Sequence, residues 1–222
     1  MAYQFDFTSI FDYTPVLIKG IIVTTQLIVV GAGLGIALGI ACAWACVFAS
    51  KTIRAPVVAY IEVIRNTPFL IQLFFIFFGL PSAGIKLTAM EASTLAMVIN
   101  LGAYSAEIIR AGIQATPRGQ YEASVSLAMT QLQVFRYIVL KPALRRVWPA
   151  LSSQVILVML GSAVCSQVAA DELTFAANFI QSRNFRAFEV YFVTTGIYLV
   201  LAILLRQVLR VIGAWLFTRR AH

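Results

Sequence analysis

The sequence predicts an all-α membrane protein with about five transmembrane helices, on three observations. Of the 222 residues, 60% are hydrophobic and only 12% are charged, so the chain has more apolar surface than a soluble core of this size buries. Apolar segments recur at lengths near the roughly 20 residues that a membrane-crossing helix needs. Basic residues collect in alternate connections, as in helical membrane proteins. The predicted spans are 18–49, 55–80, 88–109, 150–170 and 190–205.

The basic connections also predict the orientation of the chain. Residues 1–15 hold two acids and no Lys or Arg, unlike a cleaved signal peptide. Basic residues follow the first span, fill the connection after the third and end the chain, so the positive-inside rule predicts the N-terminus outside and the C-terminus in the cytoplasm. The net charge of +8 then reflects topology and contact with membrane lipid, and nucleic-acid binding is not expected. These residues include Lys51, Arg54, Arg110, Arg118, Arg136, Lys141, Arg145, Arg146, Arg219 and Arg220.

The first span carries small residues and thiols on a helical spacing. Gly31, Gly35 and Gly39 recur every four residues, which predicts a face for close packing against another helix. A moving gate helix is the functional alternative. We expect buried thiols in apolar surroundings at Cys42, at Cys46 and at a third cysteine in the fourth span. No metal site is expected, because the chain has a single histidine.

The second span is predicted to be irregular. Its uninterrupted apolar run, 69–80, is too short to cross the membrane, so the helix must recruit Glu62 and Arg65, which stand three residues apart and can pair. Pro68 disfavours helix at Thr67 and predicts a kink with free carbonyls. The break is either a substrate or gating element or a structural kink satisfied by neighbouring helices.

The third and fourth spans carry polar side chains. Asn100, Tyr104 and Glu107 share one stripe of the third span with position 103, and such residues normally face a bundle interior or a water-filled path. Glu107 can instead form an ion pair with Arg110, three residues on. The fourth span offers hydroxyl and amide groups for a polar solute or for helix contacts. The candidate translocation path comprises Thr67, Pro68, Gln72, Asn100, Tyr104, Glu107, Ser162, Ser166 and Gln167.

The basic connection at about 110–149 is predicted to form a helix-turn-helix. One short helix covers about 117–127, and a second begins at Thr130, where Gln133 completes a capping box. This loop resembles that of bacterial ABC importer permeases, whose pattern is Glu-Ala-Ala, three residues, Gly, nine residues, then Ile-x-Leu-Pro. The matching positions are Gly119, Glu122, Ala123, Ser124, Ala128, Ile138, Leu140 and Pro142.

The flanking motifs resemble the polar amino-acid branch of that family. They are the run Arg65-Asn66-Thr67-Pro68 with Gln72, the run 103–113, and the pair Glu172-Leu173, and the match covers roughly 15–212. Ser124 replaces the second Ala, Ala128 replaces the Gly, and Pro142 falls one position late. If the turn needs a left-handed residue, Ala128 costs on the order of 1 kcal/mol more than Gly. The displaced Pro142 is expected to block continuation of the helix nearby.

The resemblance implies a type I ABC importer permease fold over a single domain, 1–222, in the bacterial inner membrane. It implies a cytosolic ATPase dimer that holds ATP and Mg and receives the helix bearing Glu122, a second permease subunit, identical or homologous, and a soluble amino-acid-binding protein. No phosphate-binding loop or catalytic triad is visible in this chain, so we expect no cofactor on it and no enzymatic activity.

Two other classes of protein remain open. An ATP-independent channel or secondary carrier would need no ATPase, although secondary carriers usually contain an internal repeat, which this sequence lacks. A purely structural subunit would leave the helix-turn-helix without a receptor. A single copy of the fold makes a two-fold dimer the natural way to build a central path.

Overall fold

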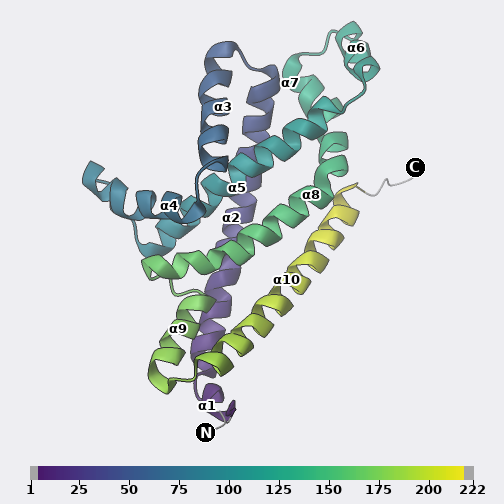
Figure 1. The fold of residues 1–222 in the computed structure, drawn as a ribbon. Helices are drawn as coiled ribbons and strands as arrows, with labels where there is room; N and C mark the ends of the chain where they lie inside the picture. Colours follow the sequence, from purple (N-terminus) through teal and green to yellow (C-terminus); the bar gives the residue numbers. More distant parts are fainter. Residues whose placement is uncertain (1–4, 218–222) are drawn as a thin grey trace. The chain divides into compact units, whose positions relative to one another are not determined.

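The computed structural model describes residues 5–217, and every regular element there is helical (Figure 1). Arg219 and Arg220, used for the orientation prediction, lie outside the described residues. The elements are α1 Thr8–Phe11, α2 Thr14–Phe48, α3 Lys51–Arg65, α4 Phe69–Phe74, η1 Phe75–Gly79, η2 Leu80–Ala83, α5 Ala89–Gln114, α6 Arg118–Ser126, α7 Gln131–Gln133, η3 Val134–Val139, α8 Leu140–Gly161, η4 Ser162–Val168, α9 Leu173–Asn184 and α10 Ala187–Phe217.

Four helical runs are long and apolar enough to cross a membrane. They overlap the predicted first, third, fourth and fifth spans, and their bounds are Thr14–Phe48, Ala89–Gln114, Gln131–Val168 and Ala187–Phe217. The multi-pass prediction is therefore confirmed at four crossings, or five if the remaining bent pair counts as one span.

The predicted second span is that bent pair. Helix α3 ends at Arg65 and helix α4 begins at Phe69, so residues 66–68 lie outside both helices. We expected a kinked helix through this region, and the structure instead shows two separate helices. Pro68 lacks a backbone N–H and disfavours helix in the residue before it, which explains the place of the break.

The chain groups into two compact units. Unit 1 contains 5–31, 69–97 and 156–205, and unit 2 contains 32–68, 98–155 and 206–217. Helices α2, α5, α8 and α10 each contribute residues to both units. Unit 2 holds α3 and the α6–α7 loop, which we define as 115–133, and unit 1 holds α4 and α9.

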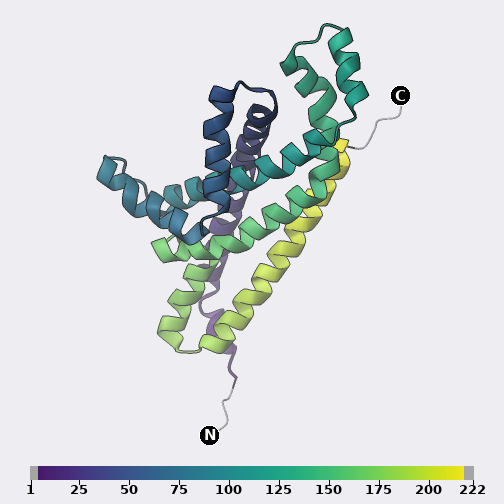
Figure 2. The same ribbon diagram turned by 45° about the horizontal axis from the view of Figure 1, so that its top comes forward.

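The core of unit 2 lies where α2, α5, η3 and α8 meet. Ile109, Val134 and Leu151 are among its buried residues. Gly39 faces Ser105 so closely that a Cβ would lie 3.0 Å from the backbone nitrogen of Ala106, which confirms close helix packing at this part of the glycine stripe. In Figure 2, α6 and the helix that begins at α7 lie side by side at one end of this unit.

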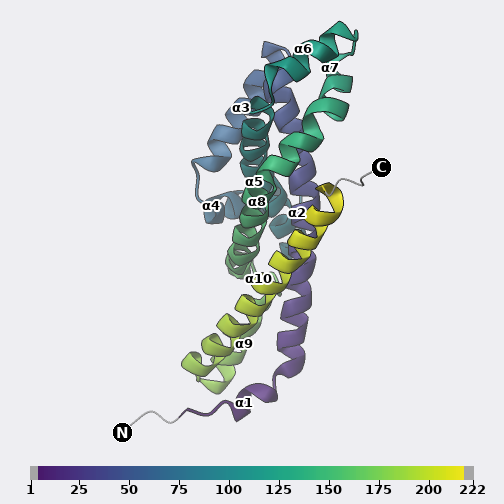
Figure 3. The same cartoon turned by 90° about the vertical axis from the view of Figure 1, so that its right-hand side faces the viewer.

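The core of unit 1 lies where α2, α9 and α10 meet. Leu17, Leu173, Ile180 and Val190 pack together there, and Figure 3 shows α9 alongside the first part of α10. Gly20 brings α2 close to α9, since a Cβ would lie 2.9 Å from the Cα of Leu173. The three cysteines, Cys42, Cys46 and Cys165, are buried and unbonded, as the sequence predicted.

Candidate functional site

Helix α6 presents an exposed surface with one carboxylate. Tyr121, Val125 and Leu127 are 42%, 56% and 75% exposed, and Glu122 is exposed among them. Ser124 is buried and its hydroxyl donates to the carbonyl of Tyr121 at 2.6 Å, so the Ser that replaces the expected Ala satisfies its own polar group. Ala123 and Gly119 are exposed, and a Cβ on Gly119 would meet nothing within 4 Å.

A left-handed turn ends α6 at Ala128. Its φ is 55°, the region that favours glycine. The N–H of Met129 donates to the carbonyl of Ser124 at 3.2 Å, and that of Ala128 to Val125 at 2.9 Å, which is the Schellman pattern of helix C-termini. Ala128 therefore occupies a turn position that glycine would adopt at lower energy.

A capping box begins the second short helix, as predicted. The N–H of Thr130 donates to the side chain of Gln133 at 2.8 Å, and the N–H of Gln133 donates to the Thr130 hydroxyl at 3.4 Å. With the Schellman turn, this cap fixes both helix ends that border the loop.

The expectation that Pro142 blocks the helix is wrong. The helical run continues from Gln131 to Val168 through a π-helical turn, Val134–Val139. Pro142 is the third residue of α8 and follows the π-helical turn closely, so the helix passes through the proline without ending. Ile138 and Leu140 are half-buried against the core of unit 2 and Pro142 is exposed, so the two apolar motif residues anchor the loop.

A cavity of about 420 Å³ lies beneath α6, and Tyr121 and Glu122 are part of its wall. The end of α5 supplies Ile113 and Thr116, and the end of α2 supplies Phe48. The exposed face of α6 therefore continues into a hollow, which gives a partner protein both a protruding helix and a recess.

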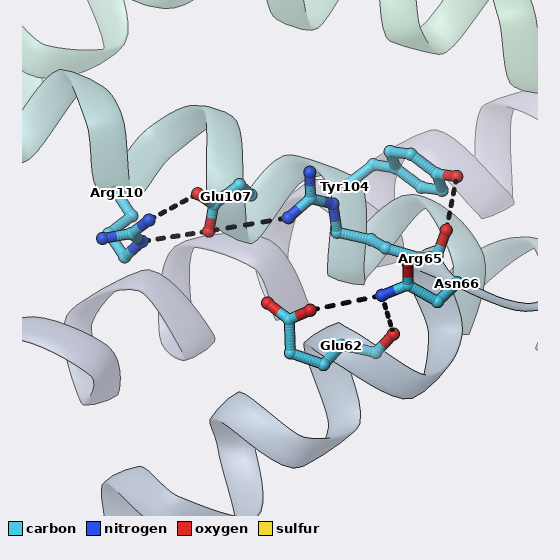
Figure 4. Close-up of polar contacts among 6 residues, drawn as sticks. All are labelled: Glu62, Arg65, Asn66, Tyr104, Glu107 and Arg110. Atoms are coloured by element: carbon cyan, nitrogen blue, oxygen red, sulfur yellow. Dashed lines mark hydrogen bonds and ion pairs between the residues drawn. The ribbon is translucent and has the colours of Figure 1, made fainter.

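Polar residues of α3 and α5 meet in a network within unit 2 (Figure 4). Arg110 donates to both oxygens of Glu107, from Nε at 2.9 Å and from Nη2 at 2.5 Å, so the predicted ion pair is confirmed. Arg65 adds a second cation, whose Nη1 lies 3.9 Å from Glu107 Oε2. The Tyr104 hydroxyl donates to the carbonyl of Arg65 at 3.4 Å, and the guanidinium lies 5.9 Å from the centre of the Tyr104 ring.

The rest of the stripe on α5 is largely buried. Asn100 is 9% exposed, and Ala103, which shares the stripe by spacing, is completely buried. Tyr104 and Glu107 therefore form its accessible part, because both are only half-buried.

Two local expectations at the helix break are wrong. Glu62 does not take Arg65 as its ion-pair partner, since Arg65 turns to Glu107 and the Glu62 carboxylate accepts from the Asn66 amide at 3.2 Å. The carbonyls were expected to be free, but Glu62 O accepts from Asn66 Nδ2 at 2.8 Å and Val63 O from the Thr67 hydroxyl at 2.8 Å. Side chains therefore cap the end of α3, while Thr67 and Pro68 are exposed.

The remaining path candidates lie in unit 1. Ser162 and Ser166 are buried, and their hydroxyls donate to carbonyls of their own helix, Met159 at 2.7 Å and Ala163 at 2.8 Å. Gln72 is 8% exposed on α4, which packs against η4, and Gln167 is exposed. The two serine hydroxyls are thus used inside the helix, and Gln167 is the accessible amide.

Glu172 is a buried polar residue to which the sequence analysis gave no role. It is completely buried, accepts the N–H of Phe175 at 2.8 Å at the start of α9, and accepts the Tyr198 hydroxyl at 2.6 Å. Burial raises the pKa of its carboxyl, although hydrogen bonds to the carboxylate oppose that shift. An acid just before a helical apolar segment is a cap signal, which could have revealed the helix start but not the contact with Tyr198.

Comparisons with known proteins agree on one family. The profile described as "Binding-protein-dependent transport system inner membrane component" matches residues 35–217. The glutamine transport system permease protein GlnP of Escherichia coli K12 is 32% identical over 93% of this chain and 95% of its own length. The probable glutamine ABC transporter permease protein GlnM of Bacillus subtilis is 39% identical over 65% of this chain and 67% of its own.

Solved structures share the fold. A chain from the crystal structure of an amino acid ABC transporter with histidines has a TM-score of 0.84 and 38% identity, with 95% of this chain and 99% of that chain covered. A chain of the MetNI methionine ABC transporter, in an inward facing conformation, has a TM-score of 0.78 at 20% identity, covering 93% and 98%, and this second likeness concerns the fold alone.

Proposed function

The chain belongs to the family of binding-protein-dependent transport system inner membrane components and is a permease subunit of an amino-acid ABC importer, and we propose that a separate ATPase drives it through the α6–α7 loop. In this proposal a cytosolic ATPase dimer holds ATP and Mg, and a second permease subunit completes the path. A soluble binding protein delivers the amino acid. The chain lies in a bacterial inner membrane with its N-terminus outside and its C-terminus in the cytoplasm.

The exposed face of α6 is the observation that supports this proposal. A nine-residue helix with two exposed large apolar side chains, a third at its C-cap and one exposed carboxylate is typical of a surface that a partner covers. The exposed carboxylate of Glu122 can also accept charge-assisted hydrogen bonds from basic groups of a partner. The fixed ends of the loop would let a rigid helix transmit movement from the ATPase.

Glu122→Lys tests the coupling role directly. We expect ATP-dependent uptake and ATPase association to fall more than about ten-fold, because like charge replaces a charge-assisted contact, while the far-UV spectrum and thermal midpoint stay unchanged. Gln120→Lys is the matched control, since positions two apart on a helix point to different faces. Wild-type uptake and ATPase association in the Glu122 variant would refute the coupling assignment.

Copurification separates this proposal from an ATP-independent channel or carrier. Gentle affinity purification followed by mass spectrometry should recover an ABC ATPase in an amount comparable to the permease. Uptake by the purified chain alone, in vesicles without any ATPase, would overturn the proposed mechanism.

We also propose that the accessible stripe at Tyr104 and Glu107 faces the translocation path, together with Thr67 and Pro68 at the break. Tyr104 and Glu107 are polar and half-buried, and Thr67 and Pro68 are exposed, which supports this assignment. In a background lacking Cys42, Cys46 and Cys165, Tyr104→Cys should react with a small polar thiol reagent at a rate that changes when ATP is trapped on the partner. Ala103→Cys is the buried control. Protection of Tyr104→Cys in both states, in a variant that transports, would remove this face from the path.

A further inference from the structure

Four exposed phenylalanine rings gather in unit 1, where segment 5–13 meets the start of α10 (Figure 1). We define the phenylalanine cluster as Phe5, Phe7, Phe188 and Phe192. Ring centroids lie 5.2 Å apart for Phe5 and Phe188, 6.1 Å apart for Phe7 and Phe192, and 6.2 Å apart for the two rings of α10. Phe7 is 36% exposed, and the other three are 58% to 64% exposed. An apolar surface of this kind indicates a partner outside the chain.

Polar contacts hold segment 5–13 against α10. The backbone N–H of Asp6 donates to Glu189 Oε1 at 3.1 Å, and the Asp6 carboxylate lies 3.5 Å from Arg186 Nη2. Arg186 Nη1 also donates to Glu189 Oε1 at 3.1 Å, and Glu189 is completely buried. Asp6 stands between the two phenylalanines of the segment, so its polar groups contact the chain while the neighbouring rings stay exposed.

The cluster lies at one end of a membrane-crossing stretch. Helix α10 has no charged residue over 190–205, between Glu189 and Arg206. That stretch rises about 24 Å in a helix, and the hydrocarbon core of a bilayer is about 30 Å thick. Phe188 and Phe192 therefore lie close to the level where acyl chains meet lipid headgroups.

The surroundings of the cluster favour lipid as the partner. The exposed face of α10 stays apolar beyond the cluster, since Leu199, Val200 and Ile203 are 60%, 55% and 49% exposed. Only 17% of the apolar stretch of α10 is buried, against 61% for α5. The four rings also carry no polar atom, whereas protein interfaces regularly include hydrogen-bonding groups. A surface that is apolar along the whole crossing is suited to acyl chains.

A strained residue lies three positions before the cluster. Phe185, in the turn between α9 and α10, has a φ of 55° and is 82% exposed. A residue with a Cβ loses on the order of 1 kcal/mol in this left-handed region, and a ring in water gains nothing from burial. An outward-pointing ring in a strained turn is a further indication of an apolar partner outside the chain.

We propose that the phenylalanine cluster and Phe185 insert into the phospholipid surface at the N-terminal end of α10, so that segment 5–13 lies in the membrane interface. The rings occupy the layer between the headgroups and the acyl chains. The contacts among Asp6, Arg186 and Glu189 then satisfy polar groups at a depth where water is scarce. This inference requires neither the ATPase nor the binding protein.

The collision rates of a nitroxide label test the depth of the segment. The full chain, with the subunits that copurify with it, is placed in vesicles of phosphatidylethanolamine and phosphatidylglycerol. It carries one spin-labelled cysteine, Phe7→Cys or Phe188→Cys, and alanine at the three native cysteines. Oxygen, which dissolves in lipid, should relax both labels several-fold more than a water-soluble nickel complex does. Asp12→Cys is the control in the same segment, because an exposed carboxylate avoids lipid, and the nickel complex should dominate there.

Other occupants of this surface would give different results. A soluble binding protein would leave both labels more accessible to the nickel complex until the protein is added, and would then protect them from both reagents. A second copy of the chain would protect both labels from oxygen and from the nickel complex at all times. Either result, or dominance of the nickel complex under all conditions, would overturn the proposal.

Substitution of the rings tests whether they hold the segment in lipid. With the label at Phe11→Cys, which is 73% exposed in the parent, the pair Phe5→Ser and Phe7→Ser should lower the ratio of oxygen to nickel collisions several-fold. The pair Phe5→Leu and Phe7→Leu should keep the ratio, because leucine is also apolar. The thermal midpoint checks that both variants fold. A ratio that the serine pair leaves unchanged would refute the role of these rings.

Discussion

Two interruptions of helix in unit 2 are built differently: the turn at Ala128 and the break at Asn66–Pro68. Backbone hydrogen bonds close the first, in the Schellman pattern and followed by a capping box. Side chains close the second, through Asn66, Thr67 and the contacts of Arg65 with Tyr104 and Glu107. The turn therefore depends on contacts between near neighbours alone, whereas the break also depends on Tyr104 and Glu107, which are distant in sequence.

The difference matters for the roles that we propose. A loop closed by its own backbone can act as a rigid lever between the permease and a partner. A break held by side chains can change when a single contact is lost, which suits a segment beside a translocation path. Substitutions in the two places should then change the free energy of unfolding by different amounts and in opposite directions.

Glu107→Ala should have the largest effect. Removal of the carboxylate leaves Arg110 and Arg65 without their shared anion, and the Arg110 side chain is only 33% exposed. We therefore expect a loss of about 2 kcal/mol in the free energy of unfolding. Thermal or denaturant unfolding in detergent measures it. Glu122→Ala is the control, because that carboxylate lies on the exposed face of α6. Equal stability of the two variants would show that the network does not hold the break.

Asn66→Ala should have an intermediate effect. The variant loses the amide bonds to the Glu62 carbonyl and carboxylate, and we expect a loss of about 1 kcal/mol. The same unfolding assay measures it. Two results together would contradict the role of side chains at the break. They are an Asn66→Ala variant as stable as the parent protein, and amide hydrogens at the end of α3 that exchange no faster than in the parent.

Ala128→Gly should have the smallest effect on stability, and it should stabilise the protein where the two preceding variants destabilise it. Glycine removes the steric cost of a left-handed φ and should stabilise the protein by up to about 1 kcal/mol. Ala123→Gly makes the same substitution inside α6 and should destabilise by about 1 kcal/mol. A loss of stability in both variants would mean that Ala128 is not left-handed in the protein.

Much of the fold was predictable because its signals are local. Apolar length identified four crossings, and Thr130 with Gln133 identified a helix start that the structure confirms. The Glu107–Arg110 pair was also predictable, since residues three apart on a helix are neighbours. The same rule failed for Glu62 and Arg65, because Arg65 has a competing partner on another helix.

The sequence by itself determined four long apolar helices, the short helices of the α6–α7 loop and the position of the break, because each follows from residues within a few turns of one another. Only the tertiary structure decided the contact of Tyr104 with Arg65 and the burial of Glu172 against Tyr198. Those contacts join residues 39 and 26 positions apart. Which distant polar groups meet depends on how the helices pack, and helical periodicity specifies the face of a residue but not its partner.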